Sequence, residues 1–146
     1  MSKIKKLVKK SKKIARLAAK LDSIPEIRIE TTLAMKKNPE IAGEYYPGSQ
    51  VIFIRKSIAT LGEKKACKVI LHEIGHYLHH VYFQWKPMYI RRKKRGDRSY
   101  YCNSSHLESF AECFADYAWA LYRGKNKKIE AFKRLSKMKS ILDKIP

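Results

Sequence analysis

Acidic residues are scarce in this sequence. Its 146 residues include 33 Lys or Arg but only 13 Asp or Glu, which gives a formal net charge of +20. Such a charge attracts polyanions, including nucleic acid, anionic membranes and acidic protein surfaces, and it says little about the fold. Solubility is the simpler interpretation, but long blocks of one sign repel themselves and usually serve a partner. A polyanion therefore stays among the candidate partners.

Cysteines and long apolar runs are also few. The three cysteines, Cys67, Cys102 and Cys113, form no Cys-x-x-Cys pair, and their odd number suits a reducing compartment. No run of about 18 or more apolar residues occurs, so we expect no transmembrane segment. Residues 1–21 are basic but lack a continuous apolar run and a small-residue cleavage site, which argues against a secretory signal. These absences predict a cytoplasmic or otherwise intracellular protein, or one encoded by a virus or mobile element.

Length and composition predict a single domain, residues 1–146, of the α+β class. A chain of 146 residues that is 45% hydrophobic can build one core but not two. Its positive charge is concentrated in three blocks: residues 3–20, with nine Lys or Arg and no acid, residues 91–95, and residues 125–139.

The first half of the chain combines a helix with short strands. Apolar residues from Ile4 to Leu21 recur at helical spacing among lysines, which predicts an amphipathic helix over about 2–21. This helix can pack on the core, lie on a membrane or follow a phosphate backbone, and its pattern does not separate these placements. Residues 26–33 alternate like a half-buried strand. Aromatic and β-branched runs around Pro47-Gly48-Ser49 predict a hairpin of strands 44–46 and 51–54.

Three helices are predicted in the second half. Thr60-Leu61-Gly62-Glu63 has the form of a capping box, so a largely apolar helix should run from there to about residue 80, in the middle of the domain. Residues 82–103 are predicted to form a loop, and a loop of this length is often functional. A serine at 104 or 105 is expected to cap a second apolar helix over 107–122. The last helix is predicted at about 128–142.

The most informative motif is His72-Glu73-Ile74-Gly75-His76, on the first of these helices. Helical residues four apart lie about 6 Å apart on one face, so His72 and His76 can bind one metal ion. Glu73 then stands beside the ion, within reach of a metal-bound water. The alternative is a helix that merely carries two histidines. The apolar flanks and a downstream ligand favour a hydrolytic site with one zinc ion as its cofactor.

A catalytic zinc has three protein ligands and one open position, so a third ligand is needed. The candidates are Glu108, Glu112, Asp116 and His106, which lie on or just before the second apolar helix. A carboxylate within so apolar a helix is costly unless it is paired, hydrogen-bonded or bound to metal. Glu108 can instead be the acid of a Ser105-x-x-Glu108 capping box, and Glu112 can then ligate. His106 would give a three-histidine site, but it precedes the helix.

Residues 108–114, Glu-Ser-Phe-Ala-Glu-Cys-Phe, follow the histidine motif at a suitable distance. Together they resemble the catalytic core of the anthrax toxin lethal factor family and the related Pro-Pro endopeptidases, which are gluzincin metallopeptidases. The resemblance covers about residues 44–118. It implies a minimal zincin fold: a small N-terminal sheet with an edge hairpin, a central HExxH helix, a glutamate helix and a C-terminal helix. It also implies that Glu108 is the third zinc ligand and that Tyr101 lies over the zinc.

The resemblance has limits, and some roles stay open. The chain is far more basic than that family, carries no large accessory domain and shows no secretion signal, so the family's substrates are not transferred to it. Glu112 is interpreted as a second-shell acid that accepts an imidazole N–H, and Asp116 as a similar acid or a rim residue. Tyr100 can replace Tyr101 with a shift of one residue. His79 and His80 face away from the ligand stripe and are expected not to bind zinc.

These residues predict a zinc-dependent endopeptidase. Zinc on His72, His76 and Glu108 would lower the pKa of its water toward about 7, and Glu73 would take the proton and pass it to the leaving amine. Tyr101 would stabilise the tetrahedral intermediate together with the zinc. The strand 51–54 is expected to be an edge strand that pairs with an extended peptide or protein substrate through main-chain hydrogen bonds.

Three other interpretations remain open. The basic helix and the loop at 91–98 can hold nucleic acid while the zinc site cuts a neighbouring protein. The chain can also be a non-catalytic zinc-binding module, although a structural zinc has no use for a general base such as Glu73. Finally, the N-terminal helix or the loop at 86–100 can cover the cleft and keep the enzyme latent. The sequence does not predict the cleavage motif or the oligomeric state.

Overall fold

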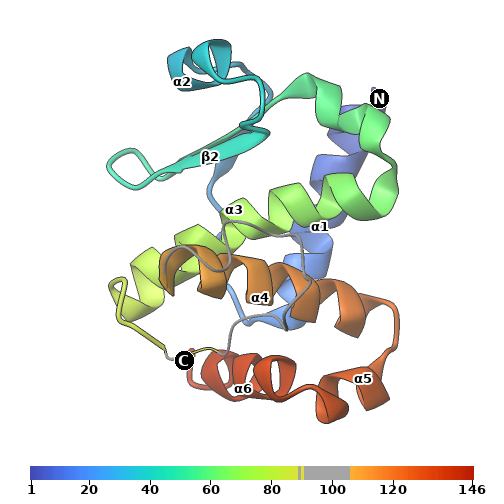
Figure 1. Ribbon diagram of the computed structural model, residues 1–146, viewed down its shortest axis with the longest axis vertical. Helices are drawn as coiled ribbons and strands as arrows, with labels where there is room; N and C mark the ends of the chain where they lie inside the picture. Colours follow the sequence, from blue (N-terminus) through green and yellow to red (C-terminus); the bar gives the residue numbers. More distant parts are fainter. Residues whose placement is uncertain (89, 91–105) are drawn as a thin grey trace.

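The computed structural model describes residues 1–88, 90 and 106–146. In chain order the elements are α1 (Lys3–Ala18), β1 (Glu26–Arg28), α2 (Leu33–Lys37), β2 (Gly43–Tyr46), β3 (Val51–Ile54), η1 (Lys56–Leu61), α3 (Glu63–Phe83), α4 (His106–Tyr122), α5 (Asn126–Ala131) and α6 (Lys133–Leu142). The sheet with α2, then α3, then α4, then α5 and α6 follow one another down the molecule (Figure 1). The α+β class is confirmed, while the zincin fold itself stays a prediction.

The sheet has the strand order β1-β3-β2, with β3 in the centre. β1 is parallel to β3 and β2 is antiparallel to it, so both Ile27 and Tyr45 lie opposite Ile52. The predicted hairpin is present, but the prediction that strand 51–54 is an edge is wrong. β1 returns to pair with the outer side of β3, and a pairing so distant in sequence leaves no trace in the hairpin pattern. The continuous apolar run of β3 is typical of a strand buried on both faces.

α3 begins later than the sequence suggests and ends later. Its first residue is Glu63, after Gly62, whose φ of 89° is a left-handed value that favours glycine. The predicted capping box is wrong, because Thr60 lies in η1 and its hydroxyl donates to the Ser57 carbonyl at 2.7 Å. The helix runs to Phe83, where Gln84 turns into the left-handed region. α3 is buried along much of its length and forms the centre of the domain, as predicted.

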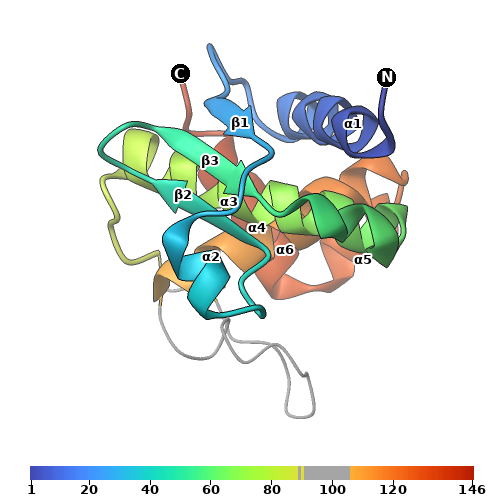
Figure 2. The ribbon, with the colours of Figure 1, turned by 90° about the horizontal axis from the view of Figure 1, so that it is seen from above.

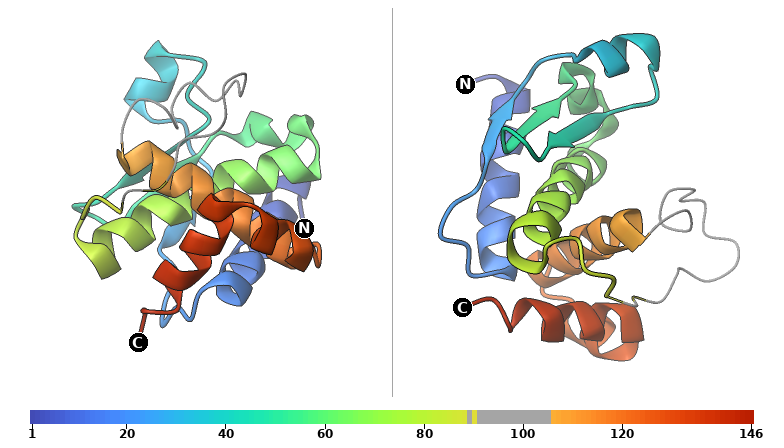
Figure 3. Two further views of the ribbon diagram at one scale, coloured as in Figure 1. Left: turned by 60° about the horizontal axis from the view of Figure 1, so that its bottom comes forward. Right: turned by 90° about the vertical axis from the view of Figure 1, so that its left-hand side faces the viewer.

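α1 packs on the core, which is one of the three placements left open by its sequence. Its buried residues are Ile4, Leu7, Ser11, Ile14, Ala15 and Ala18. The helix lies against α3 and α4 (Figure 2), and most of its lysines are exposed. The helix is shorter than predicted, and Leu17, which belongs to the apolar pattern, is 59% exposed. α1 therefore covers one side of the α3–α4 pair (Figure 3).

α3 and α4 are antiparallel neighbours, and a glycine brings them together. A Cβ atom on Gly75 would lie 2.9 Å from the Cα atom of Ala111 on α4, closer than real side chains come. Gly75 is the fourth residue of the histidine motif, so the closest approach of the two helices occurs within that motif. Side chains on the facing surface of α4 are therefore within reach of His72 and His76.

The C-terminal segment contains two helices rather than the single predicted helix at 128–142. The chain is extended at Phe132, which separates α5 from α6. Of the apolar positions predicted to share one side of this helix, Ile129, Leu135, Ile141 and Leu142 are buried, but Phe132 is 41% exposed. Among the described residues, no helix has the length and apolar character needed to cross a membrane.

Candidate metal centre

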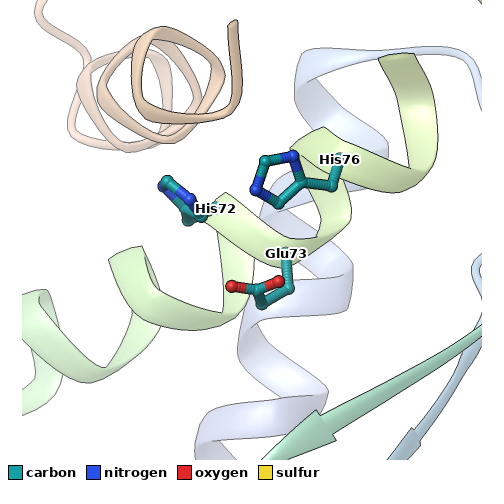
Figure 4. Close-up of side chains that lie close together, drawn as sticks. All are labelled: His72, Glu73 and His76. Carbon is teal, nitrogen blue, oxygen red and sulfur yellow. The ribbon is translucent and has the colours of Figure 1, made fainter. Parts of the chain in front are cut away.

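The two histidines of the motif project from consecutive turns of α3 (Figure 4). Their ring centroids are 4.8 Å apart and the rings are nearly perpendicular. His72, Glu73 and His76 each offer a ligand atom, and these atoms lie within 4.8 Å of one another. A group of two imidazoles and a carboxylate at this spacing can hold a metal ion, although the sequence prediction placed Glu73 beside the ion rather than on it.

Glu108 reaches the same point from α4. Its Oε2 atom lies 2.8 Å from Nε2 of His72, and its Oε1 atom lies 3.1 Å from Nε2 of His76. One carboxylate therefore meets the equivalent nitrogen of both imidazoles. This arrangement does not suit an acid that acts only as a helix cap, although Ser105, the partner of the proposed capping box, lies outside the described residues.

Either Glu73 or Glu108 could therefore be the third ligand. Glu108 contacts both Nε2 atoms, whereas Glu73 leaves the α3 ribbon on a different side from the two imidazoles (Figure 4). Glu73 is only 7% exposed. These contacts make Glu108 the better candidate ligand, and the predicted division of roles, with Glu73 beside the ion, stays a prediction.

Glu112 lies one turn beyond Glu108 and contacts the other nitrogen of His72. Its Oε2 atom is 3.3 Å from Nδ1 of His72. If Nδ1 donates this hydrogen bond, Nε2 keeps its lone pair for a metal ion, because a neutral imidazole carries a single N–H. The geometry is that of a second-shell acid, and the role stays a prediction.

The charges of the site favour a cation between these side chains. Burial alone lowers the pKa of His72, but hydrogen bonds to Glu108 and Glu112 and the nearby charge of Glu73 outweigh it and raise the pKa to about 10. Burial raises the pKa of Glu108, but hydrogen bonds from His72 and His76 hold it well below its usual range. A metal ion competes with the proton for the same nitrogen, so a divalent cation fits this donor set.

Burial also raises the pKa of Glu73, against the opposing charges of His72 and His76. The backbone of β2 passes close to this side chain, since a Cβ on Gly43 would lie 3.1 Å from Cγ of Glu73. Glycine at position 43 therefore lets the strand approach the carboxylate. A buried carboxylate that holds its proton more strongly is a better general base at neutral pH.

The site opens into a cleft of about 800 Å³. Glu73, Glu108 and both histidines lie on its walls, together with residues 40–45 before and within β2. β2 is an edge of the sheet, and no strand among the described residues pairs with its outer side. The edge strand beside the site is therefore β2 rather than the predicted strand 51–54.

Trp85 is a cleft residue that the sequence did not single out. Gln84 and Trp85 both have left-handed φ values, 46° and 60°, which turn the chain back over the end of α3. The indole stacks on His80 at 5.1 Å and lines the cleft. A left-handed backbone conformation costs about 1 kcal/mol or more at each non-glycine residue, and the residue types at these two positions do not predict it. The close approaches at Gly43 and Gly75 were likewise missed; Gly75 at least lies within the motif, whereas Gly43 is distant from it in the sequence.

Other predicted residues lie away from the two histidines. His106 is exposed, and its Nε2 atom lies 3.2 Å from the Trp85 carbonyl oxygen, so it does not complete a three-histidine site. His79 is fully buried and stacks on Phe110 at 4.3 Å. His80 contacts the Tyr45 hydroxyl through Nδ1 at 2.8 Å. As predicted, neither His79 nor His80 belongs to the metal group.

Asp116 is neither a ligand nor a second-shell acid. Its two oxygens contact Lys68 at 2.5 Å and Arg134 at 2.8 Å, two turns of α4 beyond Glu108. Lys68 lies one turn before His72 on α3. Asp116 was predicted to be either an acid that orients an imidazole or a rim residue, and its contact with Lys68 shows that the α3 residue facing it is a lysine and not a histidine.

Tyr101 and Tyr100, proposed to lie near the metal, fall outside the described residues, as do Ser104 and the basic block at 91–95. Comparisons with known protein families, with curated proteins and with solved structures give no match to this chain.

Proposed function

We propose that this protein is a metal-dependent endopeptidase, with zinc as the expected ion. The proposal rests on one observation: the Glu108 carboxylate of α4 contacts Nε2 of both His72 and His76. The buried Glu73 lies beside them, and all four side chains line an open cleft. The resemblance to gluzincin metallopeptidases supports the same residues, but the geometry does not depend on it.

Each residue has a role that follows from its position. His72, His76 and Glu108 would hold the ion, and Glu112 would fix the orientation of His72 through Nδ1. A bound divalent cation supplies Lewis-acid chemistry, which polarises a carbonyl and makes water acidic at neutral pH. Glu73 accepts the proton of the attacking water and delivers it to the leaving amine. Tyr101 remains the predicted donor to the oxyanion.

An extended peptide is the substrate that best fits the cleft. The outer side of β2 can accept a peptide as an additional strand, which provides affinity through main-chain hydrogen bonds. Because β2 passes beside Glu73 at Gly43, a peptide on this edge would cross the catalytic carboxylate. Binding of this kind favours hydrolysis within a chain rather than at its end.

The test is a peptide-library digest, read by mass spectrometry, with metal content measured on the same samples. We expect the wild type to carry one zinc ion per chain and to cleave peptides. Glu73→Ala should retain the metal and lose cleavage by at least about 100-fold, the usual contribution of a general base. Glu130→Ala, an exposed acid on α5, is the control and should behave like the wild type. Undiminished cleavage by Glu73→Ala would refute the mechanism.

The same experiment separates an enzyme from a binding module. If the wild type binds one metal ion and cleaves no peptide in the library, the non-catalytic interpretation gains and the peptidase proposal fails. If neither metal nor cleavage is found, the metal centre itself is wrong.

A further inference from the structure

A second cavity, of about 440 Å³, lies toward the end of the α3–α4 pair opposite the metal centre. We call it the basic pocket, and it is lined by six cations: Lys64, Lys68, Arg123, Lys125, Lys128 and Arg134. Among the described residues, Asp116 is the only acid that lines it. Segments from α3 to α6 contribute these side chains, so the fold gathers cations that are far apart in the sequence.

The cations of the pocket are not all free to move. Asp116 is 9% exposed and holds Lys68 and Arg134 in fixed positions at its base. One carboxylate cannot neutralise six cations, so the pocket keeps a strong positive potential. A concave surface with this potential concentrates anions of a size that fits within it.

The pocket also contains an aromatic side chain. Trp119 lies on its wall, and the Tyr122 ring packs against the indole at 5.5 Å. Lys10 of α1 lies over the Tyr122 ring at 5.1 Å, so the pocket adjoins the most basic helix of the chain. Cations and an aromatic face in one groove are the two features with which proteins bind single-stranded nucleic acid, through phosphates and stacked bases.

We propose that the basic pocket binds single-stranded nucleic acid, with phosphates on the lysines and arginines and a base stacked on Trp119. A base pair inside a duplex cannot present its face to an indole within a concavity, so a single strand fits better than a duplex. An acidic peptide would use the cations but not the aromatic wall. A membrane surface would require an exposed apolar face rather than a pocket.

The experiment is the binding of a fluorescein-labelled oligothymidylate strand, followed by fluorescence anisotropy over a range of salt concentrations. Lys64→Glu with Lys128→Glu changes two exposed residues that line the pocket, one on α3 and one on α5. Lys36→Glu with Lys37→Glu makes the same charge change on α2, at the far end of the molecule (Figure 1). We expect the pocket variant to lose at least about tenfold more affinity than the α2 variant. The slope of log affinity against log salt concentration should become shallower by about 0.7 for each phosphate contact that the variant loses.

Stacking is tested separately. Trp119→Leu should weaken binding by about tenfold, while Trp119→Phe should remain close to the wild type. In a Trp85→Phe background Trp119 is the sole tryptophan, and its fluorescence should be quenched by the strand. If Trp119→Leu does not fold, the lysine variants and the quenching of Trp119 fluorescence still test the proposal.

Two results would overturn the proposal. Equal loss of affinity in the pocket and α2 variants would mean that only net charge matters. Competition by polyglutamate or by phosphatidylserine vesicles as strong as that by unlabelled oligothymidylate would assign the pocket to another class of polyanion. Because the readout is binding, both results are independent of peptidase activity.

Discussion

The two ends of the α3–α4 pair share a framework and differ in chemistry. On α4, Glu108, Glu112 and Asp116 follow one another at intervals of four residues. On α3, His76, His72 and Lys68 face them at the same interval. Imidazole can exchange its proton for a metal ion near neutral pH, whereas a lysine or arginine keeps its proton. A stripe of carboxylates therefore builds a metal centre only where the facing helix supplies histidine.

The cleft at one end of the α3–α4 pair and the basic pocket at the other end also differ in charge. Five glutamates and two lysines line the cleft of the metal centre, while six cations and one aspartate line the basic pocket. Lys68 lines both cavities. A net charge of +20 thus describes the protein as a whole but not the metal centre, where carboxylates are concentrated.

The largest expected effect is on zinc affinity, in a comparison of two α4 carboxylates, one at each end of the α3–α4 pair. Glu108→Ala removes the carboxylate that meets both imidazoles, so zinc affinity should fall by more than about 100-fold, beyond the loss typical of a second-shell residue. Asp116→Asn should leave zinc affinity unchanged and lower the free energy of unfolding by about 1–3 kcal/mol, because Lys68 and Arg134 lose their charged partner. Competition with a chromophoric chelator measures the first quantity, and urea unfolding the second. Similar zinc affinities for the two variants would remove the distinction between the two ends.

Gly75→Ala tests whether the close approach of α3 and α4 builds the centre. Alanine is normally the better helix former, but here its Cβ would meet Ala111 at 2.9 Å. We expect a loss of about 1–3 kcal/mol in the free energy of unfolding, with weaker zinc binding. Gly48→Ala is the matched control, since a Cβ there meets nothing within 4 Å. A Gly75→Ala protein as stable as the wild type would show that the two helices can separate without cost.

Glu112→Ala tests the second-shell contact to His72. Its removal leaves Nδ1 without this acceptor, so zinc affinity should fall by about 10–100-fold while Glu108 still binds. Isothermal titration with zinc measures the change. A loss as large as that in Glu108→Ala would instead make Glu112 a ligand.

The last prediction concerns the pH dependence of the metal-free protein. The pKa of His72 is raised from 6.5 to about 10, so its folded state binds the proton more tightly than the unfolded state does. The stabilisation is complete below about pH 6.5 and is lost as the pH rises toward 10. Urea unfolding in the presence of a chelator should show this decline in the wild type and a weaker one in His72→Gln. Identical profiles would mean that His72 does not carry the charge.

Much of this arrangement follows from local sequence. The spacing of His72 and His76 places both on one face of any helix, and acids within the apolar residues of α4 need partners wherever the helix lies. The β2–β3 hairpin is marked by its turn residues. These features depend on neighbours in the chain and can be predicted without a structure.

The remaining features depend on contacts between distant segments. The pairing of β1 with β3, which makes β2 the edge beside the site, joins strands separated by more than twenty residues. The assignment of Asp116 to Lys68 rather than to a metal depends on the register of α3 against α4, which Gly75 and Ala111 fix. The predicted capping box failed because the chain forms η1 before α3 begins, so a common motif fell outside the helix.

X-ray absorption at the zinc edge, on zinc-loaded wild type, Glu108→Ala and Glu73→Ala, tests the central claim most directly. We expect two imidazole nitrogens at about 2.0–2.1 Å, with one carboxylate oxygen and one water oxygen at about 2.0–2.2 Å in the wild type, and with the carboxylate lost in Glu108→Ala and retained in Glu73→Ala. A wild-type protein that binds no zinc, or whose carboxylate ligand disappears in Glu73→Ala instead, would contradict the claim that α3 and α4 hold the ion between them.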